Sequence, residues 1–106
     1  MEYKYEILTD EGNVKEITDN IEGDLKAVIL RTNHRIGFSL NSELGYELYS
    51  YKDMMPGVYY IPLRANASVQ DTGGAYTGVP FTLNEKLFLY VAGPPNVKVE
   101  IILRVD

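Results

Sequence analysis

The sequence contains no cysteine, no tryptophan and a single histidine among its 106 residues. Without thiols the chain cannot form a disulfide framework, a cysteine-based zinc site or a cysteine nucleophile. One imidazole also cannot supply a metal site with several histidine ligands. These absences predict a protein with no catalytic residue, no metal ion and no cofactor.

The chain also has little positive charge and no long apolar run. Ten Lys and Arg residues stand against fifteen Asp and Glu residues, a formal net charge of -5, and the basic residues form no stripe for nucleic-acid phosphates. The longest nearly apolar stretches, residues 87–92 and 101–103, are far shorter than the roughly twenty residues that cross a bilayer. We therefore expect neither a nucleic acid nor a membrane as partner.

The start of the chain is charged from Glu2 onward, so it does not have the pattern of a secretory signal, and we expect a soluble protein made in the cytoplasm. Residues 1–24 hold eight carboxylates and only two lysines. Such a segment can face a basic partner or a metal ion, but strands with one solvated face have the same composition. We favour solvated strand faces.

Several short motifs suggest chemistry that their context does not support. His34 lies between Asn33 and Arg35, which indicates a turn histidine and not a catalytic base. Residues 10–13 and 71–74 combine oxygen ligands with glycine, but they lack the alternating ligands of an EF-hand loop. The alternating glutamates likewise indicate solvated strand faces and not a pair of catalytic acids.

The composition predicts one folded domain. Hydrophobic residues make up 45% of the chain and aromatic residues 11%, and 106 residues are too few for two independent cores. We predict a single domain over residues 1–106, with residues 1–24 as a peripheral acidic strand or hairpin.

The first half of the chain predicts strands. Polar and apolar residues alternate from residue 2, which is typical of an amphipathic strand, and residues 14–18 have the pattern of the returning arm of a hairpin. Residues 25–32 form a continuous apolar run rich in β-branched side chains, which predicts a central strand buried on both faces. The expected elements are strands at residues 2–8, 14–18, 25–32 and 35–40, a loop at 19–24, and turns at 9–13 and 33–34.

The middle of the chain is less regular. Residues 44–51 fit both helical and strand spacing, and we prefer a strand because apolar residues recur at every second position. A Pro-Gly pair predicts a turn over residues 52–57. In the following strand, residues 58–64, Pro62 has no N–H for a ladder, which indicates an edge strand or a strand end. Residues 65–80 are expected to be the longest loop.

The C-terminal third has the clearest pattern. Residues 86–92 and 97–105 flank a Gly-Pro-Pro-Asn turn, and apolar residues alternate strictly along the second segment, so we predict a β-hairpin. About seven to nine short strands without a clean helical stripe predict an all-β antiparallel sandwich, either jelly-roll-like or immunoglobulin-like. The cysteine pair and tryptophan of immunoglobulin domains are absent.

Tyrosine is the residue type that stands out. The chain has nine tyrosines, and five of them fall within residues 46–60. Tyrosine is enriched at protein interfaces, where its ring is buried and its hydroxyl finds a partner. Since there is neither a basic groove nor a tryptophan platform, we favour a protein interface over stacking with sugars or bases. The candidate interface residues are Tyr46, Tyr49, Tyr51, Tyr59, Tyr60 and Tyr76.

The order of features from residue 25 to the C-terminus carries a family resemblance. A strand with the sequence Val58-Tyr-Tyr-Ile-Pro62 precedes a Gly-rich loop through Gly73, Gly74 and Gly78. Residues 79–87 then lead into the two final strands. This order resembles small β-rich virion proteins of tailed bacteriophages, and the acidic first 24 residues lie outside the resemblance.

The resemblance implies a non-enzymatic structural protein of the phage particle, such as a capsid decoration or head accessory protein, made in the bacterial host cytoplasm and located in the virion. Its implied partners are the major capsid protein or another virion protein, and further copies of the chain in a homo-oligomer such as a trimer. Two other classes stay open. A carbohydrate-binding module would use exposed tyrosines such as Tyr49 and Tyr59, and a small β-barrel enzyme would need paired acids or a metal.

Overall fold

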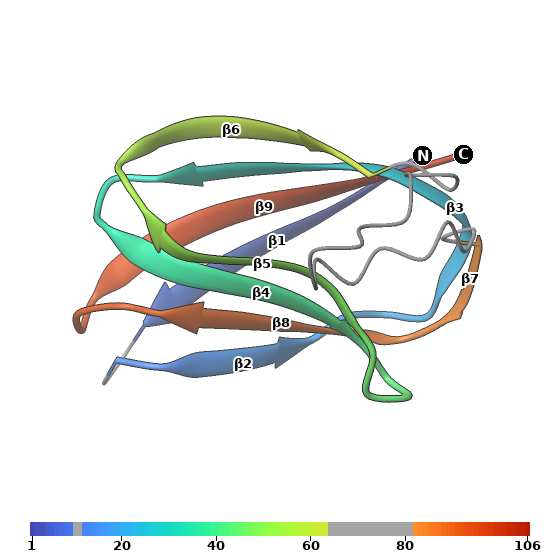
Figure 1. Ribbon diagram of the computed structural model, residues 1–106, viewed down its shortest axis with the longest axis horizontal. Coiled ribbons are helices and arrows are strands. Elements are labelled where there is room, and N and C mark those ends of the chain that lie inside the picture. Colours follow the sequence, from blue (N-terminus) through green and yellow to red (C-terminus); the bar gives the residue numbers. More distant parts are fainter. Residues whose placement is uncertain (10–11, 64–81) are drawn as a thin grey trace, which may run out of the picture.

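The computed structural model describes residues 1–9, 12–63 and 82–106, and within them the chain forms nine β-strands (Figure 1). No helix in these ranges has the length and apolar character needed to cross a membrane. The strands are β1 (Glu2–Thr9), β2 (Val14–Ile17), β3 (Ile21–Thr32), β4 (Ile36–Ser42), β5 (Glu47–Met54), β6 (Gly57–Pro62), β7 (Thr82–Glu85), β8 (Leu87–Ala92) and β9 (Val97–Val105).

The strand pairs are antiparallel and nested within one another. β1 pairs with β9, β2 with β8, β3 with β6, and β4 with β5. Two further pairs, β3–β9 and β4–β8, complete a first sheet in the order β1-β9-β3-β6 and a second sheet in the order β2-β8-β4-β5. The short β7 pairs with the start of β3. A long hairpin rolled up in this way is a jelly roll, so the predicted β-sandwich is confirmed in its jelly-roll form.

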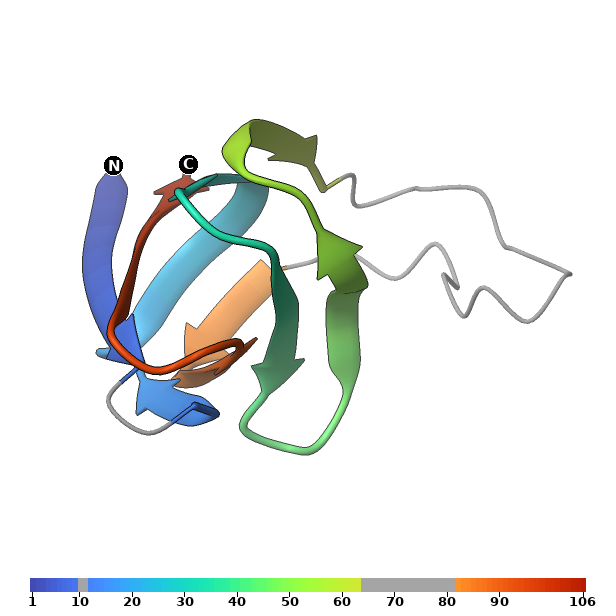
Figure 2. The same cartoon turned by 90° about the vertical axis from the view of Figure 1, so that its left-hand side faces the viewer.

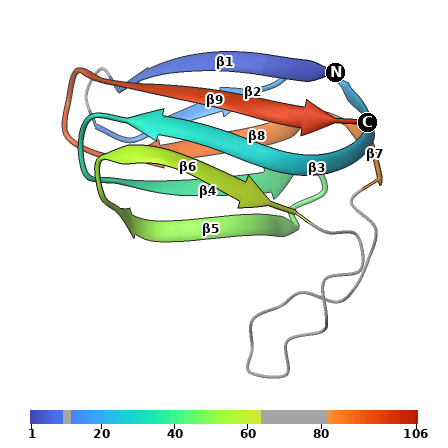
Figure 3. The same cartoon turned by 90° about the horizontal axis from the view of Figure 1, so that it is seen from above.

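The core lies between the inner faces of the two sheets, and Figure 3 shows the first sheet in front of the second. Because side chains alternate across a strand, each sheet contributes every second residue to this layer. The predicted alternation along the last strand is confirmed, since the five apolar residues at alternate positions from 97 to 105 are each at most 2% exposed. The facing side chains include Ile36, Phe38 and Leu40 of β4 and Val97, Val99, Ile101, Leu103 and Val105 of β9.

Both predicted hairpins are wrong, and for the same reason. β1 and β2 belong to different sheets, and β8 and β9 also belong to different sheets, so the members of each pair do not share a ladder. The chain changes layer after β1 and again after β8. Alternation shows which face of a strand is buried, but it does not show which strand is the neighbour.

Buried hydroxyls complete the hydrogen bonding where the chain changes layer. Thr9 Oγ1 donates to the carbonyl of Pro94 at 2.6 Å and accepts from the N–H of Val97 at 2.9 Å. Thr18 Oγ1 accepts from the N–H of Leu87 at 2.8 Å. Both threonines are buried. Since an unpaired buried N–H is costly, these hydroxyls stabilise the points at which β8 and β9 begin.

β3 begins earlier and is less deeply buried than the sequence indicated. Residues 21–24 pair with β7, so the predicted loop over 19–24 is wrong beyond Asn20. The strand is central in the first sheet, as predicted. Its inner face is buried, but its outer face is mixed, because Arg31 is exposed, Ile29 is half-buried and Ala27 is fully buried.

The preference for a strand over a helix around residues 44–51 is confirmed, but the strand is displaced toward the C-terminus. The N–H of Ser42 donates to the carbonyl of Tyr46 at 2.7 Å, which closes a turn that leaves Leu44 77% exposed. The predicted turn over 52–57 is shorter, since Met54 is fully buried as the last residue of β5.

The predicted edge strand is confirmed. β6 lies at the end of the first sheet, and Pro62 is its last residue, where the missing N–H costs no ladder bond. The predicted loop over residues 65–80 lies outside the described residues. At the opposite edge, β1 pairs with β9 along its whole length and contributes Ile7 to the core.

Candidate protein interface

Five of the six predicted interface tyrosines lie on one side of the sandwich, and the sixth, Tyr76, lies outside the described residues. β5 and β6 are the edge strands of the second and the first sheet, and Figure 2 shows them next to each other on the same side. Tyr46 precedes β5, and the other four lie on these two strands. The structure brings the rings of Tyr51 and Tyr59 together, whereas Tyr46 lies at the opposite end of β5 from the connection to β6.

The five tyrosines differ in their exposure. Tyr46, Tyr60 and Tyr51 are 68%, 59% and 42% exposed. Tyr60 lies on the outer face of the first sheet, where the guanidinium carbon of Arg104 is 5.9 Å from its ring centroid. These three rings are available for contact with another protein.

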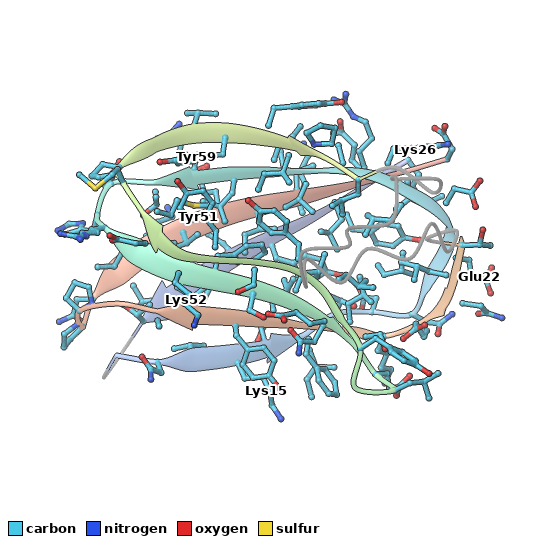
Figure 4. All side chains as sticks on the ribbon, in the orientation of Figure 1. Lys15, Glu22, Lys26, Tyr51, Lys52 and Tyr59 are labelled. Carbon is cyan, nitrogen blue, oxygen red and sulfur yellow. The ribbon has the colours of Figure 1, made fainter. Side chains whose placement is uncertain are left out.

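Tyr49 and Tyr59 are half-buried and pack against the core. The ring centroids of Tyr51 and Tyr59 lie 6.2 Å apart, so the pair bridges the edges of the two sheets (Figure 4). The Tyr59 hydroxyl donates to the carbonyl of Met55 at 2.6 Å, which fixes the orientation of the ring. Tyr49 packs against Phe38 with centroids 6.3 Å apart. These two rings pack against the core and expose little surface area for contact with a partner.

The sequence reasoning missed two apolar residues of this surface because it followed tyrosine alone. Met55 is 55% exposed and Val58 is 70% exposed. Val58 could have been found, because it shares the outer face of β6 with Tyr60 at period two. Of the ten large apolar or aromatic side chains that are exposed in the described part of the chain, five lie within residues 46–60. We call these five the 46–60 surface: Tyr46, Tyr51, Met55, Val58 and Tyr60.

Three ion pairs lie on the outer face of the first sheet. Arg104 and Glu2 approach to 3.2 Å, Lys98 and Glu6 to 3.2 Å, and Arg31 and Glu100 to 3.9 Å. Glu2 of β1 lies directly opposite Arg104 of β9, whereas Glu6 lies opposite Glu100 and pairs diagonally with Lys98. This arrangement agrees with the interpretation of the N-terminal acids as a solvated strand face.

The outer face of the second sheet is different, because it is hollowed by a groove of about 590 Å³. Its floor includes Gly37 and Ser39 on β4 and Ala92 on β8. Lys15 on β2 and Lys52 on β5 line its two sides. The sequence reasoning did not find this groove, since it is formed by four strands that are distant in the chain.

Few titratable groups in the described residues have shifted pKa values. Burial raises the pKa of the Tyr5 hydroxyl, which remains protonated and lies 3.4 Å from the Asp19 carboxylate. Arg35 forms a two-pronged ion pair with Asp53 and lowers the pKa of that carboxyl. His34 lies in the predicted turn and is exposed. Among the described residues, no three His, Asp or Glu side chains come together in a way that could hold a metal ion.

The fold and its surfaces define an antiparallel jelly-roll β-sandwich. No protein-family model matches the chain, and no curated protein matches it. A solved structure of the infectious bursal disease virus Gx strain is similar with 12% identity and a TM-score of 0.33, over 99% of this chain and 32% of that one. A structure of the Gt strain has 12% identity and a TM-score of 0.28, over 100% of this chain and 39% of that one.

The chain therefore spans about a third of the length of the virus chains to which it is similar. The structural similarity is weak. The proposals below are argued from the residues of the chain itself.

Proposed function

We propose that the chain is a non-enzymatic structural protein of a tailed-phage particle, a capsid decoration or head accessory protein that attaches through protein–protein contacts. The observation that carries this proposal is the concentration of exposed apolar side chains on the 46–60 surface. Contiguous exposed apolar area is uncommon on a monomer and marks contact with another macromolecule.

The composition of this surface fits a protein partner. Three of its five members are tyrosines and one is a methionine, two residue types that are enriched at the centres of interfaces. Most of the surface lies on β5 and β6, which are edge strands in the described part of the chain, so a partner that binds it could also pair with a strand edge.

A modest interface suffices for a protein that binds a lattice of identical sites. Linked copies bind more tightly than one copy because each later contact is intramolecular. A closed homo-oligomer such as a trimer would supply that linkage, with the major capsid protein or another virion protein as partner. We also propose that the protein is located in the virion.

Cosedimentation with empty capsids of the phage that carries the gene tests this function. We expect binding that is lost in the variant Val58→Ser/Tyr60→Ser, because these two residues contribute exposed apolar area without supporting the core. The variant Leu8→Ser/Ile17→Ser removes exposed apolar side chains of 51% and 50% exposure from β1 and β2 and should bind normally. Absence of binding by the native chain across a range of salt concentrations would disprove the capsid role.

The carbohydrate-binding alternative needs different residues from those first considered. Tyr49 and Tyr59 are half-buried against the core, so their ring faces offer no open platform. The groove on the second sheet is the observation that favours a ligand site, and it lies on another face of the molecule from Tyr60 and Val58.

A further inference from the structure

The groove on the second sheet is built from residues that leave space above the sheet. Along its floor, Gly37, Ser39, Ser50 and Ala92 have the smallest side chains available. A Cβ atom added at Gly37 would lie 3.7 Å from the Cβ of Ala92, so even one extra carbon there would occupy the floor. A ligand can therefore come close to the backbone of the two central strands, β4 and β8.

Within residues 1–9, 12–63 and 82–106, the two lysines at the sides of the groove have no carboxylate partner. Five basic residues of the described chain form ion pairs, and all five lie elsewhere: Lys26, Arg31, Arg35, Lys98 and Arg104. Lys15 and Lys52 are both exposed, and they lie on the two edge strands of the second sheet (Figure 4). The nearest acid in sequence to Lys52, Asp53, is already held by Arg35.

The groove therefore carries a local positive charge in a protein whose formal net charge is -5. Among the residues that the structure describes, no Asp or Glu lines it. Lys15 is also oriented, because its ammonium nitrogen lies 5.0 Å from the ring centroid of Phe88. Two cations on opposite sides of a concave surface with no anion between them are complementary to a ligand with negative charges.

The remaining lining selects among anionic ligands. Tyr90 is 37% exposed and is fixed edge-on against Phe88, with ring centroids 6.4 Å apart. The negative face of an aromatic ring attracts the C–H groups of a sugar ring. The Ser39 hydroxyl donates to Asn41 Oδ1 at 2.6 Å, so it can only accept a hydrogen bond from a sugar hydroxyl. The Ser50 hydroxyl can also hydrogen-bond to a sugar hydroxyl.

Other occupants fit less well. The face of a sheet presents side chains and no free backbone ladder, so an extended peptide gains no strand pairing there. Two lysines are too few for the phosphates of a nucleic acid. We propose that this groove binds an anionic oligosaccharide, with Lys15 and Lys52 on its acid groups and a sugar ring against Tyr90.

Calorimetric titration of the native chain with two probes tests the proposal and distinguishes the acid group. The first probe is tetragalacturonate, which carries carboxylates, and the second is a heparin-derived tetrasaccharide, which carries sulfates. We expect at least one of them to bind. The methyl ester of tetragalacturonate keeps the sugar rings and removes the charges, so it should bind about tenfold more weakly or worse than the acid if the carboxylate probe is the ligand.

Charge-removing variants locate the site. Lys15→Gln and Lys52→Gln should each weaken binding of the preferred probe by about tenfold. Lys4→Gln is the matched control, because Lys4 is an exposed lysine without an ion pair on β1 of the other sheet. It should leave binding within about twofold of the native chain, since exposed charges beyond a Debye length are screened.

Three results would overturn the proposal: no binding of either probe, equal binding of tetragalacturonate and its ester with no binding of the sulfated probe, or equal loss in Lys4→Gln and in the two groove variants. Failure here leaves the capsid function standing, because that function depends on the 46–60 surface. Conversely, capsid binding lost in Val58→Ser/Tyr60→Ser says nothing against the groove.

Discussion

The outer faces of the two sheets show opposite uses of charge. On the first sheet, β1 and β9 place acids beside bases, and three ion pairs cross the face. On the second sheet, Lys15 and Lys52 have no ion-pair partner in the described part of the chain, and they lie on either side of a groove with a floor of small residues. Both sheets contribute the same kind of apolar inner face, so the difference does not come from the demands of the core.

This difference indicates where recognition can occur. A face whose charges are paired with one another attracts a charged ligand only weakly. Surface ion pairs of this kind also add little stability. A face with unpaired cations and open space keeps its binding capacity. The following predictions test whether the two faces are as distinct as the structure indicates.

The largest loss of stability is expected for a substitution in the core. Comparing it with a substitution on the outer face of the same sheet distinguishes the two faces of the second sheet. Phe38 on β4 is 2% exposed on the inner face, so Phe38→Ala should lower the free energy of unfolding by about 3–5 kcal/mol. Ser50 is exposed on the groove floor and provides the control. Ser50→Ala should change the free energy of unfolding by no more than about 0.5 kcal/mol. Urea unfolding monitored by tyrosine fluorescence measures both. Similar losses in the two variants would show that the groove is part of the packed interior.

Filling the groove should remove ligand binding while leaving the sandwich folded. Ala92 is exposed on the groove floor, so Ala92→Phe places a ring where the sugar is proposed to lie. We expect binding of the preferred oligosaccharide to weaken by about tenfold or more, which is about 1.4 kcal/mol. Calorimetry measures the binding, and circular dichroism verifies the fold. Undiminished binding by this variant would place the ligand elsewhere.

Charge reversal should affect stability on the first sheet and not on the second. Arg31→Glu puts a second carboxylate beside Glu100 and should cost up to about 1 kcal/mol at low salt, less at high salt, because both side chains are largely exposed. Lys52→Glu reverses the same charge in the groove and should stay within about 0.5 kcal/mol. Urea unfolding at low and high salt compares the two. An equal, salt-dependent loss would mean that Lys52 has a partner in solution.

The smallest effect concerns the ion pair that connects β4 and β5. Arg35 lowers the pKa of Asp53, so the stability from this pair is present above the ordinary aspartate pKa and is lost as the pH falls through the lowered value. Arg35→Gln should return the Asp53 pKa to its ordinary range, as measured by carbon NMR titration of the carboxyl group. An unchanged pKa would contradict the pairing.

The sequence was sufficient to predict the strands but not their neighbours. Strict alternation in residues 97–105 identified a buried strand correctly, yet the same pattern led to a hairpin that does not exist, since β9 pairs with β1 and β3. These pairings join residues 67 to 102 positions apart, and only the packing of two layers determines them.

The candidate interface was predictable in part. Spacing of tyrosines located the region around residues 46–60, because a dense aromatic cluster is visible in the sequence itself. Which of its rings face solvent depended on the register of β5 and β6, so the half-buried Tyr49 and Tyr59 were not separated from Tyr60. The groove was not predictable, since Lys15 and Lys52 come to lie on the same sheet face only through the order of its four strands.

Mapping of amide chemical shifts during titration with the preferred oligosaccharide tests the contrast between the two faces most directly. The account predicts shifts at residues 15, 37, 39, 50, 52 and 90–92 around the groove, and none along β1 or the outer face of β9. Shifts spread equally over the ion-paired face of the first sheet, or absent from the groove, would contradict it.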